Sequence, residues 1–168
     1  MRTLLLMSLL AFFGLTPSRA IDLGAEAPAV TAVDQDGNSV SFADAYKKGV
    51  TLVYFYPKAD TPGCTKEACS LRDSFASLHA RNLQILGVSE DKPESQRKFR
   101  VKYQLPFTLI ADSDGAVAKA FGVPVMASFA RRQSFLIQNG KIVWRDLNAS
   151  TSQQAADVAK ALDQLPKS

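Results

Sequence analysis

The sequence predicts one α/β domain, with a mixed central sheet and helices on both faces. Apolar runs rich in β-branched residues, which do not alternate with polar ones, indicate strands buried on both faces. These runs alternate along the chain with segments of helical periodicity, as in a parallel sheet with crossover helices. Near the end of the chain, Asn139-Gly140 is typical of a tight hairpin turn. That hairpin adds antiparallel strands and makes the sheet mixed.

Each element follows from a local pattern. The turn residues 34–38 separate two short apolar runs and predict an early hairpin. From Pro62 to Leu78 apolar residues recur with the helical period. Ser150 and Gln153 form a capping-box pattern before the last amphipathic stretch. The expected elements are, in order, a hairpin (30–33, 40–42), a strand (50–56), a helix (62–80), a strand (83–89), a helix (93–103), a strand (107–111), a helix (115–121), a hairpin (134–138, 141–145) and a helix (155–165).

Residues 1–20 have the pattern of a secretory signal peptide, so we expect the folded domain over 21–168. A basic start at Arg2 precedes an apolar run of about a dozen residues, and the small residues Ser18 and Ala20 place cleavage after Ala20. The run is shorter than the about 20 residues of a membrane-spanning helix. An uncleaved anchor is the alternative. We expect export, to the periplasm, and no membrane association after cleavage.

Composition excludes several classes of protein. The chain is 46% hydrophobic and 21% charged, which is ordinary for a globular protein and unlike a disordered chain or collagen. Residues 1–20 hold two of the 20 Lys and Arg and none of the 16 Asp and Glu, so the remainder is too balanced to indicate nucleic acid as a partner. Two Cys and one His cannot form a four-ligand zinc site, and no nucleotide-binding motif occurs. We therefore expect neither a metal nor a cofactor.

Cys64 is the candidate nucleophile. It follows a buried strand that Pro57 ends, and it lies just inside the expected helix, which Thr61 is expected to cap. A thiol in the first helical turn faces unpaired backbone N–H groups and the positive end of the helix dipole, and both favour the reactive thiolate. This chemistry requires that solvent reaches Cys64.

Cys69 lies five residues further along the same expected helix. On a continuous helix the two Cα atoms are about 8.6 Å apart. A disulfide needs roughly 4.4–6.8 Å, so the bond requires the helix to unwind. This geometry favours a redox pair over a structural disulfide. The expected sequence is oxidation of Cys64 to a sulfenic acid and condensation with Cys69.

These residues resemble the active site of a known family. Pro57-x-x-x-Thr61-x-x-Cys64 resembles the signature of peroxiredoxins. The run from Thr61 to Cys69 is similar to the Q-type branch, also called bacterioferritin comigratory proteins, in which the second Cys often follows five residues later. The run Arg-Gln-Ser-Phe from Arg132 resembles the strand start that carries the family's arginine.

The resemblance implies a thioredoxin-like fold and a peroxidase that reduces hydrogen peroxide and alkyl hydroperoxides. Cys64 is then the peroxidatic residue and Cys69 the resolving residue, and a thioredoxin-like or other dithiol reductant restores both thiols. The resemblance assigns to Thr61 a hydrogen bond with thiolate and peroxide. It assigns to Arg132 stabilisation of the thiolate and the leaving oxygen, and to Pro57 shielding of the sulfenate.

Some assignments stay open at this stage. Arg131 precedes Arg132, and a shift of one residue exchanges their roles, although strand alternation favours Arg132. Glu67 is a further candidate, for orienting that arginine. Glu90 and Asp91 follow a strand and are more simply loop residues than acid–base catalysts. We also expect a monomer.

Two alternatives compete with the peroxidase. One is an exported thiol–disulfide oxidoreductase, which normally carries a C-x-x-C motif that this sequence lacks. The other is a non-catalytic secreted module with a structural Cys pair, in which Cys64 is buried and unreactive.

Overall fold

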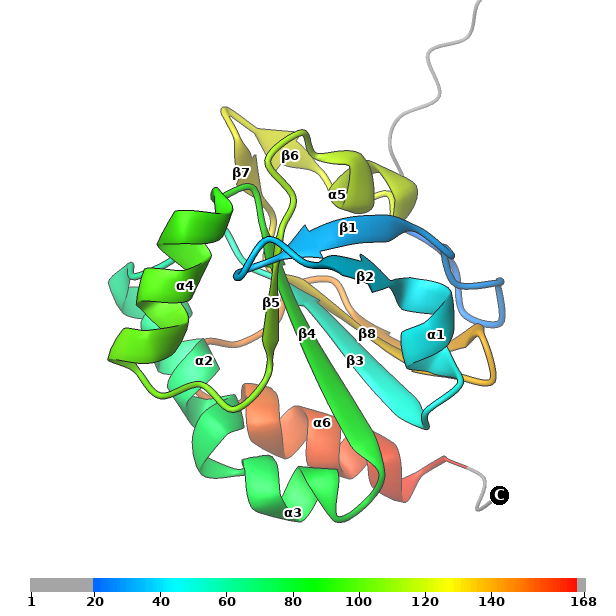
Figure 1. Cartoon of the computed structure of the whole chain (residues 1–168). Coiled ribbons are helices and arrows are strands. Elements are labelled where there is room, and N and C mark those ends of the chain that lie inside the picture. The colour runs from blue at the N-terminus through cyan, green and yellow to red at the C-terminus, as the bar shows by residue number, and fades with distance from the viewer. Residues whose placement is uncertain (1–19, 166–168) are drawn as a thin grey trace, which may run out of the picture.

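A seven-stranded mixed sheet forms the centre of the protein, whose residues 20–165 are described by a computed structural model (Figure 1). The strand order is β2-β1-β5-β4-β3-β8-β9. Strands β3, β4 and β5 are parallel, and the two predicted hairpins add antiparallel pairs, one hairpin on each side. The strands of this sheet are β1 (Thr31–Asp34), β2 (Ser39–Ser41), β3 (Val50–Phe55), β4 (Leu83–Ser89), β5 (Thr108–Ala111), β8 (Gln133–Gln138) and β9 (Lys141–Asp146).

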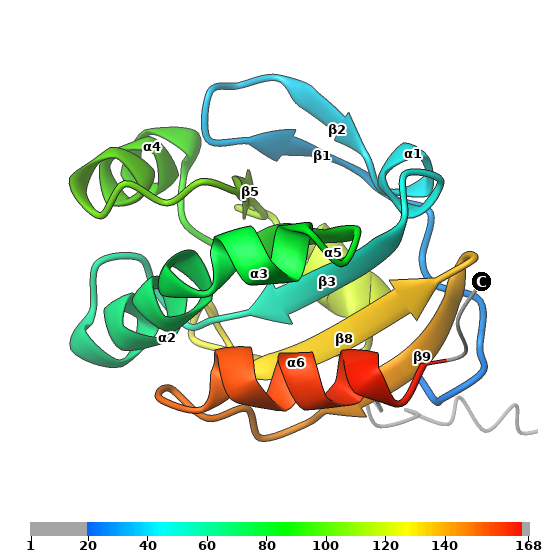
Figure 2. The same cartoon turned by 90° about the horizontal axis from the view of Figure 1, so that it is seen from below.

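Helices cover both faces of the sheet. Figure 2 shows α2, α3 and α6 side by side on one face, where they bury a common apolar cluster with α4. Helices α1 and α5 contribute to a second cluster on the other face. The helices are α1 (Phe42–Tyr46), α2 (Pro62–Asp73), α3 (Phe75–His79), α4 (Pro93–Lys102), α5 (Ala116–Ala120) and α6 (Gln154–Asp163).

The central strand β3 explains why its apolar residues do not alternate with polar ones. Leu52 and Tyr54 point into the cluster under α2, whereas Val53 and Phe55 point into the opposite cluster. All four side chains are fully buried. Each contributes about 1.5–3 kcal/mol through removal of apolar surface from water, so both layers are held to one strand.

The hairpin between β8 and β9 is confirmed with its turn. Asn139 and Gly140 have φ of 52° and 74°, the left-handed values that a type I′ turn requires at both central positions. This hairpin extends the sheet beyond β3, because β8 pairs with β3 from Thr51–Ile137 to Phe55–Gln133.

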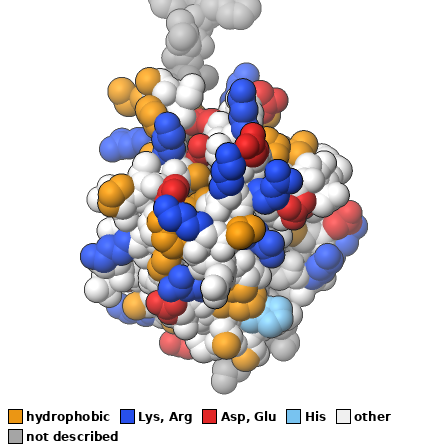
Figure 3. All heavy atoms as spheres, turned by 60° about the vertical axis from the view of Figure 1, so that its left-hand side comes forward, with side chains coloured by type: hydrophobic (Ala, Val, Ile, Leu, Met, Phe, Trp, Pro, Cys, Tyr) orange, Lys and Arg blue, Asp and Glu red, His pale blue; other side chains and the backbone are white. Residues whose placement is uncertain are grey.

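Helix α4 presents a charged face to solvent and buries its other face against the core. Gln96 and Phe99 are buried, whereas Arg97 and Lys98 are exposed. Lys98 pairs with Glu94 one turn earlier at 2.7 Å. Figure 3 shows the surrounding face of the molecule, on which Lys and Arg side chains are numerous and are mixed with acidic ones.

The expected helix over 62–80 is wrong in one respect, because it is broken at Ser74. Ser74 has φ −96° and ψ 0°, which separates α2 from α3. Serine favours such breaks because its side chain competes for backbone hydrogen bonds. The aromatic ring of Phe75 then packs against Phe107, with ring centroids 6.2 Å apart, and this contact fixes the new direction of the chain.

Three further details differ from the expectations. Helix α1, with five residues, is too short for a periodic pattern, and Ser41 Oγ caps it by accepting from Asp44 N at 3.2 Å. A small sheet of β6 (Val125–Met126) and β7 (Phe129–Ala130) was not predicted. Ser150 Oγ accepts from Gln153 N at 3.2 Å, but α6 begins only at Gln154, so Ser150 caps the preceding turn instead.

The predicted signal peptide lies outside the described residues, apart from Ala20. Within residues 20–165, none of the helices has the length and apolar character needed to cross a bilayer.

Candidate active site

The first turn of α2 brings Cys64 to the end of the central strand. Strand β3 ends at Phe55, a short turn follows, and α2 begins at Pro62. Thr65 N donates to Thr61 O at 2.8 Å, which closes the first helical turn. Cys64 therefore lies among the N-terminal residues whose N–H groups lack intrahelical partners, as the sequence predicts.

Arg132 bridges Cys64 and Glu67. Its Nη2 donates to Cys64 Sγ at 3.3 Å, and its Nη1 donates to Glu67 Oε2. The contact across 68 residues of sequence arises because β8, which Arg132 precedes, pairs directly with β3. Arg131, by contrast, is exposed and its backbone N donates to Pro124 O at 2.9 Å. The structure thus places Arg132, and not Arg131, at the thiol.

The three groups are held in a largely water-free environment. The Glu67 side chain is fully buried, and that of Arg132 is 17% exposed. Burial raises the pKa of Glu67 to about 8, although the neighbouring Arg132 opposes this change and Asp146 adds to it. Burial lowers the pKa of Arg132, but Glu67 and Cys64 outweigh this effect and raise it above its ordinary value. Arg132 therefore stays charged beside the sulfur, and a positive neighbour favours a thiolate.

Cys64 is much less accessible than we expected, since the residue is 2% exposed. The expectation of an open thiol is therefore wrong, because Cys64 packs into the cluster that contains Tyr54 and Tyr56. An inert buried thiol has only apolar neighbours, whereas this one has a guanidinium in contact. Pro57 and Thr61, in the turn that leads to Cys64, are partly exposed.

Thr61 occupies the N-cap position of α2, but its side chain does not cap the helix. Its hydroxyl instead donates to Lys58 O at 2.9 Å. The predicted cap is therefore wrong, because the turn before the helix uses the hydroxyl. In this state the Thr61 side chain supports the turn that begins at Pro57.

Cys69 lies on the same uninterrupted helix as Cys64, and both are free thiols. Cys69 is half-buried. With five residues of regular helix between them, their Cα atoms are about 8.6 Å apart. The described state is therefore the dithiol form, and a bond between the two requires α2 to unwind.

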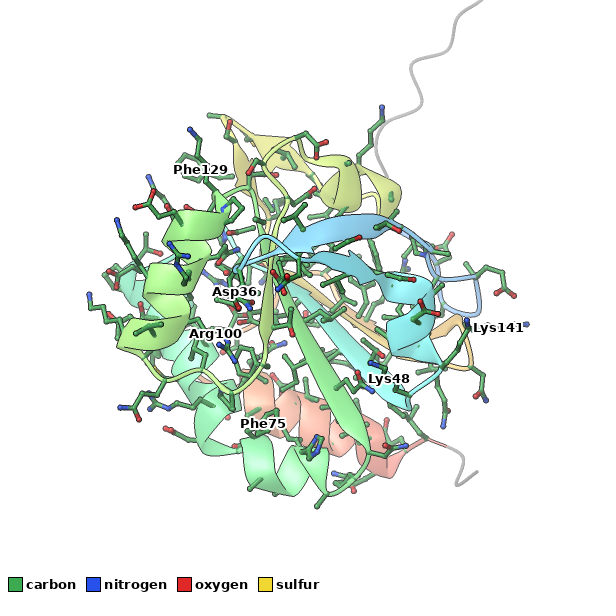
Figure 4. All side chains as sticks on the ribbon, viewed as in Figure 1. Asp36, Lys48, Phe75, Arg100, Phe129 and Lys141 are labelled. Carbon is green, nitrogen blue, oxygen red and sulfur yellow. The ribbon has the colours of Figure 1, made fainter. Side chains whose placement is uncertain are left out.

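The loop after β4 holds a residue that sequence reasoning undervalued. Asp91 Oδ2 accepts from Ala59 N at 2.7 Å, inside the turn that leads to Cys64. The Ser-x-Asp pattern at the end of a buried strand, Ser89 to Asp91, was the available signal, because parallel strands end at the same edge of a sheet. A small pocket of about 180 Å³ beside this turn is lined by Pro57 and by Phe129 of β7, among others. Figure 4 labels Phe129, whose side chain lies near one end of α4.

Comparison with known proteins identifies the family. Residues 23–145 match the family model described as AhpC/TSA family.

The chain belongs to the AhpC/TSA family.

Its relatives place this AhpC/TSA protein near the peroxiredoxin Q branch. It is 38% identical to the chloroplastic peroxiredoxin Q of Oryza sativa subsp. japonica over 125 residues, 73% of this chain and 57% of that protein. The chain thus spans little more than half the length of that curated relative. The crystal structure of peroxidoxin BcpB from Mycobacterium tuberculosis superposes with a TM-score of 0.81 at 27% identity, covering 86% of this chain and 98% of that one.

A second solved structure agrees. The bacterioferritin comigratory protein of Xanthomonas campestris, described for its alkyl peroxide reduction activity from trapped intermediate and ligand complexes, gives a TM-score of 0.76 at 28% identity. The match covers 84% of this chain and 98% of that one. The predicted resemblance to Q-type peroxiredoxins and the predicted thioredoxin-like fold are confirmed.

The AhpC/TSA match covers every candidate residue, from Pro57 to Arg132. Helix α6 lies beyond the matched residues and is joined to β8 by Gln154 Nε2, which donates to Ser134 Oγ at 2.6 Å.

Within residues 20–165, no group of three His, Cys, Asp or Glu side chains is placed to hold a metal ion.

Proposed function

We propose that this protein is a thiol-dependent peroxidase that reduces hydrogen peroxide and alkyl hydroperoxides. The observation that carries the proposal is the contact of 3.3 Å between Arg132 Nη2 and Cys64 Sγ in the first turn of α2. A helix N-terminus and a permanent cation act on the same sulfur, and both stabilise its anionic form. The likeness to the Xanthomonas campestris protein supports alkyl peroxides as substrates.

In the first step the Cys64 thiolate attacks one oxygen of the peroxide. An S–O bond forms, the O–O bond breaks, and the thiol is oxidised to a sulfenic acid while the peroxide is reduced. The leaving hydroxide or alkoxide takes a proton from solvent and departs as water or alcohol. The Arg132 guanidinium is placed to stabilise the charge that develops on the leaving oxygen.

In the second step Cys69 resolves the sulfenic acid. Its thiolate attacks the Cys64 sulfur, the S–S bond forms, and the hydroxyl group leaves as water with one proton. Helix α2 unwinds between the two residues first, because regular helical geometry holds the Cα atoms too far apart. Such local opening occurs at low-stability helix ends.

Other residues support these steps. Glu67 orients Arg132 through the hydrogen bond that its Oε2 accepts from Nη1. Pro57 shields the sulfenate from water. Thr61, whose hydroxyl supports the turn in this structure, turns toward the thiolate and peroxide when substrate binds. A dithiol donor, thioredoxin-like or of another type, supplies two electrons and two protons to restore Cys64 and Cys69.

We further propose that the protein is exported and acts as a monomer in the periplasm. The support for export is the pattern of residues 1–20, with a basic start, an apolar run and small residues before the expected cleavage site. The mass and N-terminal sequence of the protein purified from its native cells test this proposal. An N-terminus at Ile21 is expected, and retention of Met1 would contradict it.

One assay tests the enzymatic proposal. Purified protein is mixed with hydrogen peroxide and dithiothreitol, and peroxide loss is followed for wild type and Cys64→Ser. Peroxide loss that depends on Cys64 is expected. Reduction of insulin without peroxide loss would support a thiol–disulfide oxidoreductase instead. Inactivity in both assays would support a non-catalytic module.

A further inference from the structure

A chain of hydrogen bonds lies behind the turn that joins β3 to α2. Ala59 N and Ser89 Oγ both donate to Asp91 Oδ2, each at 2.7 Å. Ser89 Oγ in turn accepts from Gln96 Nε2 at 2.9 Å. This series of hydrogen bonds returns to the same turn, because Tyr56 OH donates to Gln96 Oε1. We refer to Tyr56, Ala59, Ser89, Asp91 and Gln96 as the Asp91 network.

The Asp91 network is anchored in the core of the protein. Tyr56, Ser89 and Gln96 are each no more than 1% exposed. Gln96 Nε2 also donates to Ile110 O at 2.8 Å, which ties the network to β5. Buried polar groups with satisfied hydrogen bonds rigidify their surroundings. The network therefore gives the turn a fixed support that includes α4 and two strands.

The turn itself requires external support. Asp60 has φ 59°, a left-handed conformation that L-residues rarely adopt. Asp91 holds the preceding residue through Ala59 N. On the other side, the Asp60 carboxylate accepts from Lys102 Nζ at 2.8 Å and from Tyr103 OH at 2.7 Å. Contacts from two directions thus hold a left-handed backbone conformation two residues before α2.

The shape of this turn determines whether Cys64 meets Arg132. Arg132 is positioned by the sheet, because Phe55 of β3 pairs with Gln133 of β8. Cys64 is positioned by the turn, because α2 begins immediately after it. A shift in the turn therefore moves the sulfur relative to the backbone of Arg132, from which the guanidinium reaches it, without disturbing the sheet.

We propose that Asp91 is a positioning residue for Cys64, which holds the turn over 57–61 so that the thiol meets Arg132. Asp91 acts through Ala59 and does not touch the sulfur. Its predicted effect on peroxide reduction rests on the function proposed above, whereas its effect on the state of the thiol does not.

The test uses Asp91→Ala and Asp91→Asn, each with Cys69→Ser so that one thiol remains. Asparagine keeps an oxygen that can accept from Ala59 N. The rate of Cys64 alkylation by iodoacetamide is measured against pH. In Asp91→Ala we expect the midpoint of this profile to rise by about one pH unit, and peroxide reduction near neutral pH to fall about ten- to hundredfold. In Asp91→Asn the midpoint and the rate of peroxide reduction are both expected to stay close to those of the protein that retains Asp91.

The direction of the change separates positioning from two other effects. Loss of a negative charge alone eases ionisation of a nearby thiol and moves the midpoint down, not up. Simple loosening raises the alkylation rate at all pH values and leaves the midpoint unchanged. Glu94→Gln, which removes an exposed carboxylate on α4 outside the network, is the matched control and is expected to match wild type. A midpoint in Asp91→Ala that is unchanged or lower overturns the proposal.

Two further measurements keep the outcomes distinct. Ser89→Ala removes the hydroxyl that orients the Asp91 carboxylate, and it is expected to raise the midpoint by a smaller amount; it replaces Asp91→Ala if that variant does not fold. Wild type is assayed for peroxide loss in parallel. A raised midpoint with an inactive wild type supports the positioning role and refutes the peroxidase. An active wild type with an unchanged midpoint in the variants supports the peroxidase and refutes the positioning role of Asp91.

Discussion

Glu67 Oε2 accepts a hydrogen bond from Arg132 Nη1 out of contact with water, since the Glu67 side chain is fully buried. The same guanidinium also donates to Cys64. One guanidinium therefore contacts both side chains. These two contacts fix the orientation of the guanidinium at the sulfur.

Replacement of Arg132 by Lys is expected to slow the reaction of Cys64 with hydrogen peroxide by about 10²–10³-fold. Lysine keeps the charge but cannot contact Cys64 and Glu67 at once, because its ammonium is a single point rather than a planar fork. The second-order rate constant from stopped-flow mixing measures the effect. Arg131→Lys is the matched control, since Arg131 is exposed. Equal losses in the two variants would contradict the assignment.

Removal of the Glu67 carboxylate is expected to change how stability depends on pH. Burial raises the pKa of Glu67 from 4.5 to about 8. Between these values the folded protein holds a proton that the unfolded chain has released, so the free energy of unfolding falls as pH rises. Glu67→Gln carries no such proton and is expected to show a smaller fall.

Urea unfolding at about pH 5 and about pH 8 measures this difference. Both proteins carry Cys64→Ser, so that the thiol does not contribute to the titration. If the two proteins lose the same free energy of unfolding over this range, Glu67 is not the group responsible.

Much of the fold follows from local sequence patterns. The buried strands β3 and β4 were recognisable because both faces of each are covered, so their apolar residues are continuous. The β8–β9 turn was recognisable because Asn139-Gly140 suits left-handed backbone conformations. Cys64 was recognisable because its place after a strand and at a helix start is a local property.

The features that sequence reasoning missed depend on distant contacts. The break at Ser74 reflects packing of Phe75 on Phe107, which belongs to another part of the chain. The low exposure of Cys64 depends on how α2 packs on the sheet. Asp91 gains its role only because β4 ends beside β3, which brings its carboxylate to Ala59. The Ser-x-Asp pattern at the end of β4 marks Asp91 as a candidate, but it does not show that the carboxylate reaches Ala59.

Strand β4 offers a test of core packing away from the thiols. A Cβ added at Gly87 would lie 2.7 Å from the Tyr54 hydroxyl and 2.8 Å from its ring carbons. Gly87→Ala is therefore expected to lower the free energy of unfolding by about 1–3 kcal/mol. Gly63→Ala is the control, since its Cβ would meet its nearest atoms at 3.4 and 3.5 Å, ordinary contact distances. Urea unfolding under reducing conditions measures both, and equal stabilities would contradict the packing argument.

Oxidation is expected to reduce the helical content of the protein, and Cys69 is expected to be required for this change. Cys64 and Cys69 share the continuous helix α2, so a disulfide forms only after the residues between them leave helical geometry. One equivalent of peroxide added to wild type should lower the helical circular dichroism signal. In Cys69→Ser the first oxidation still occurs but stops at the sulfenic acid, so the signal is expected to stay unchanged while a dimedone adduct appears on Cys64. Mass spectrometry identifies the adduct and confirms the disulfide in wild type. A wild-type protein that forms the disulfide with undiminished helicity would show that α2 need not unwind.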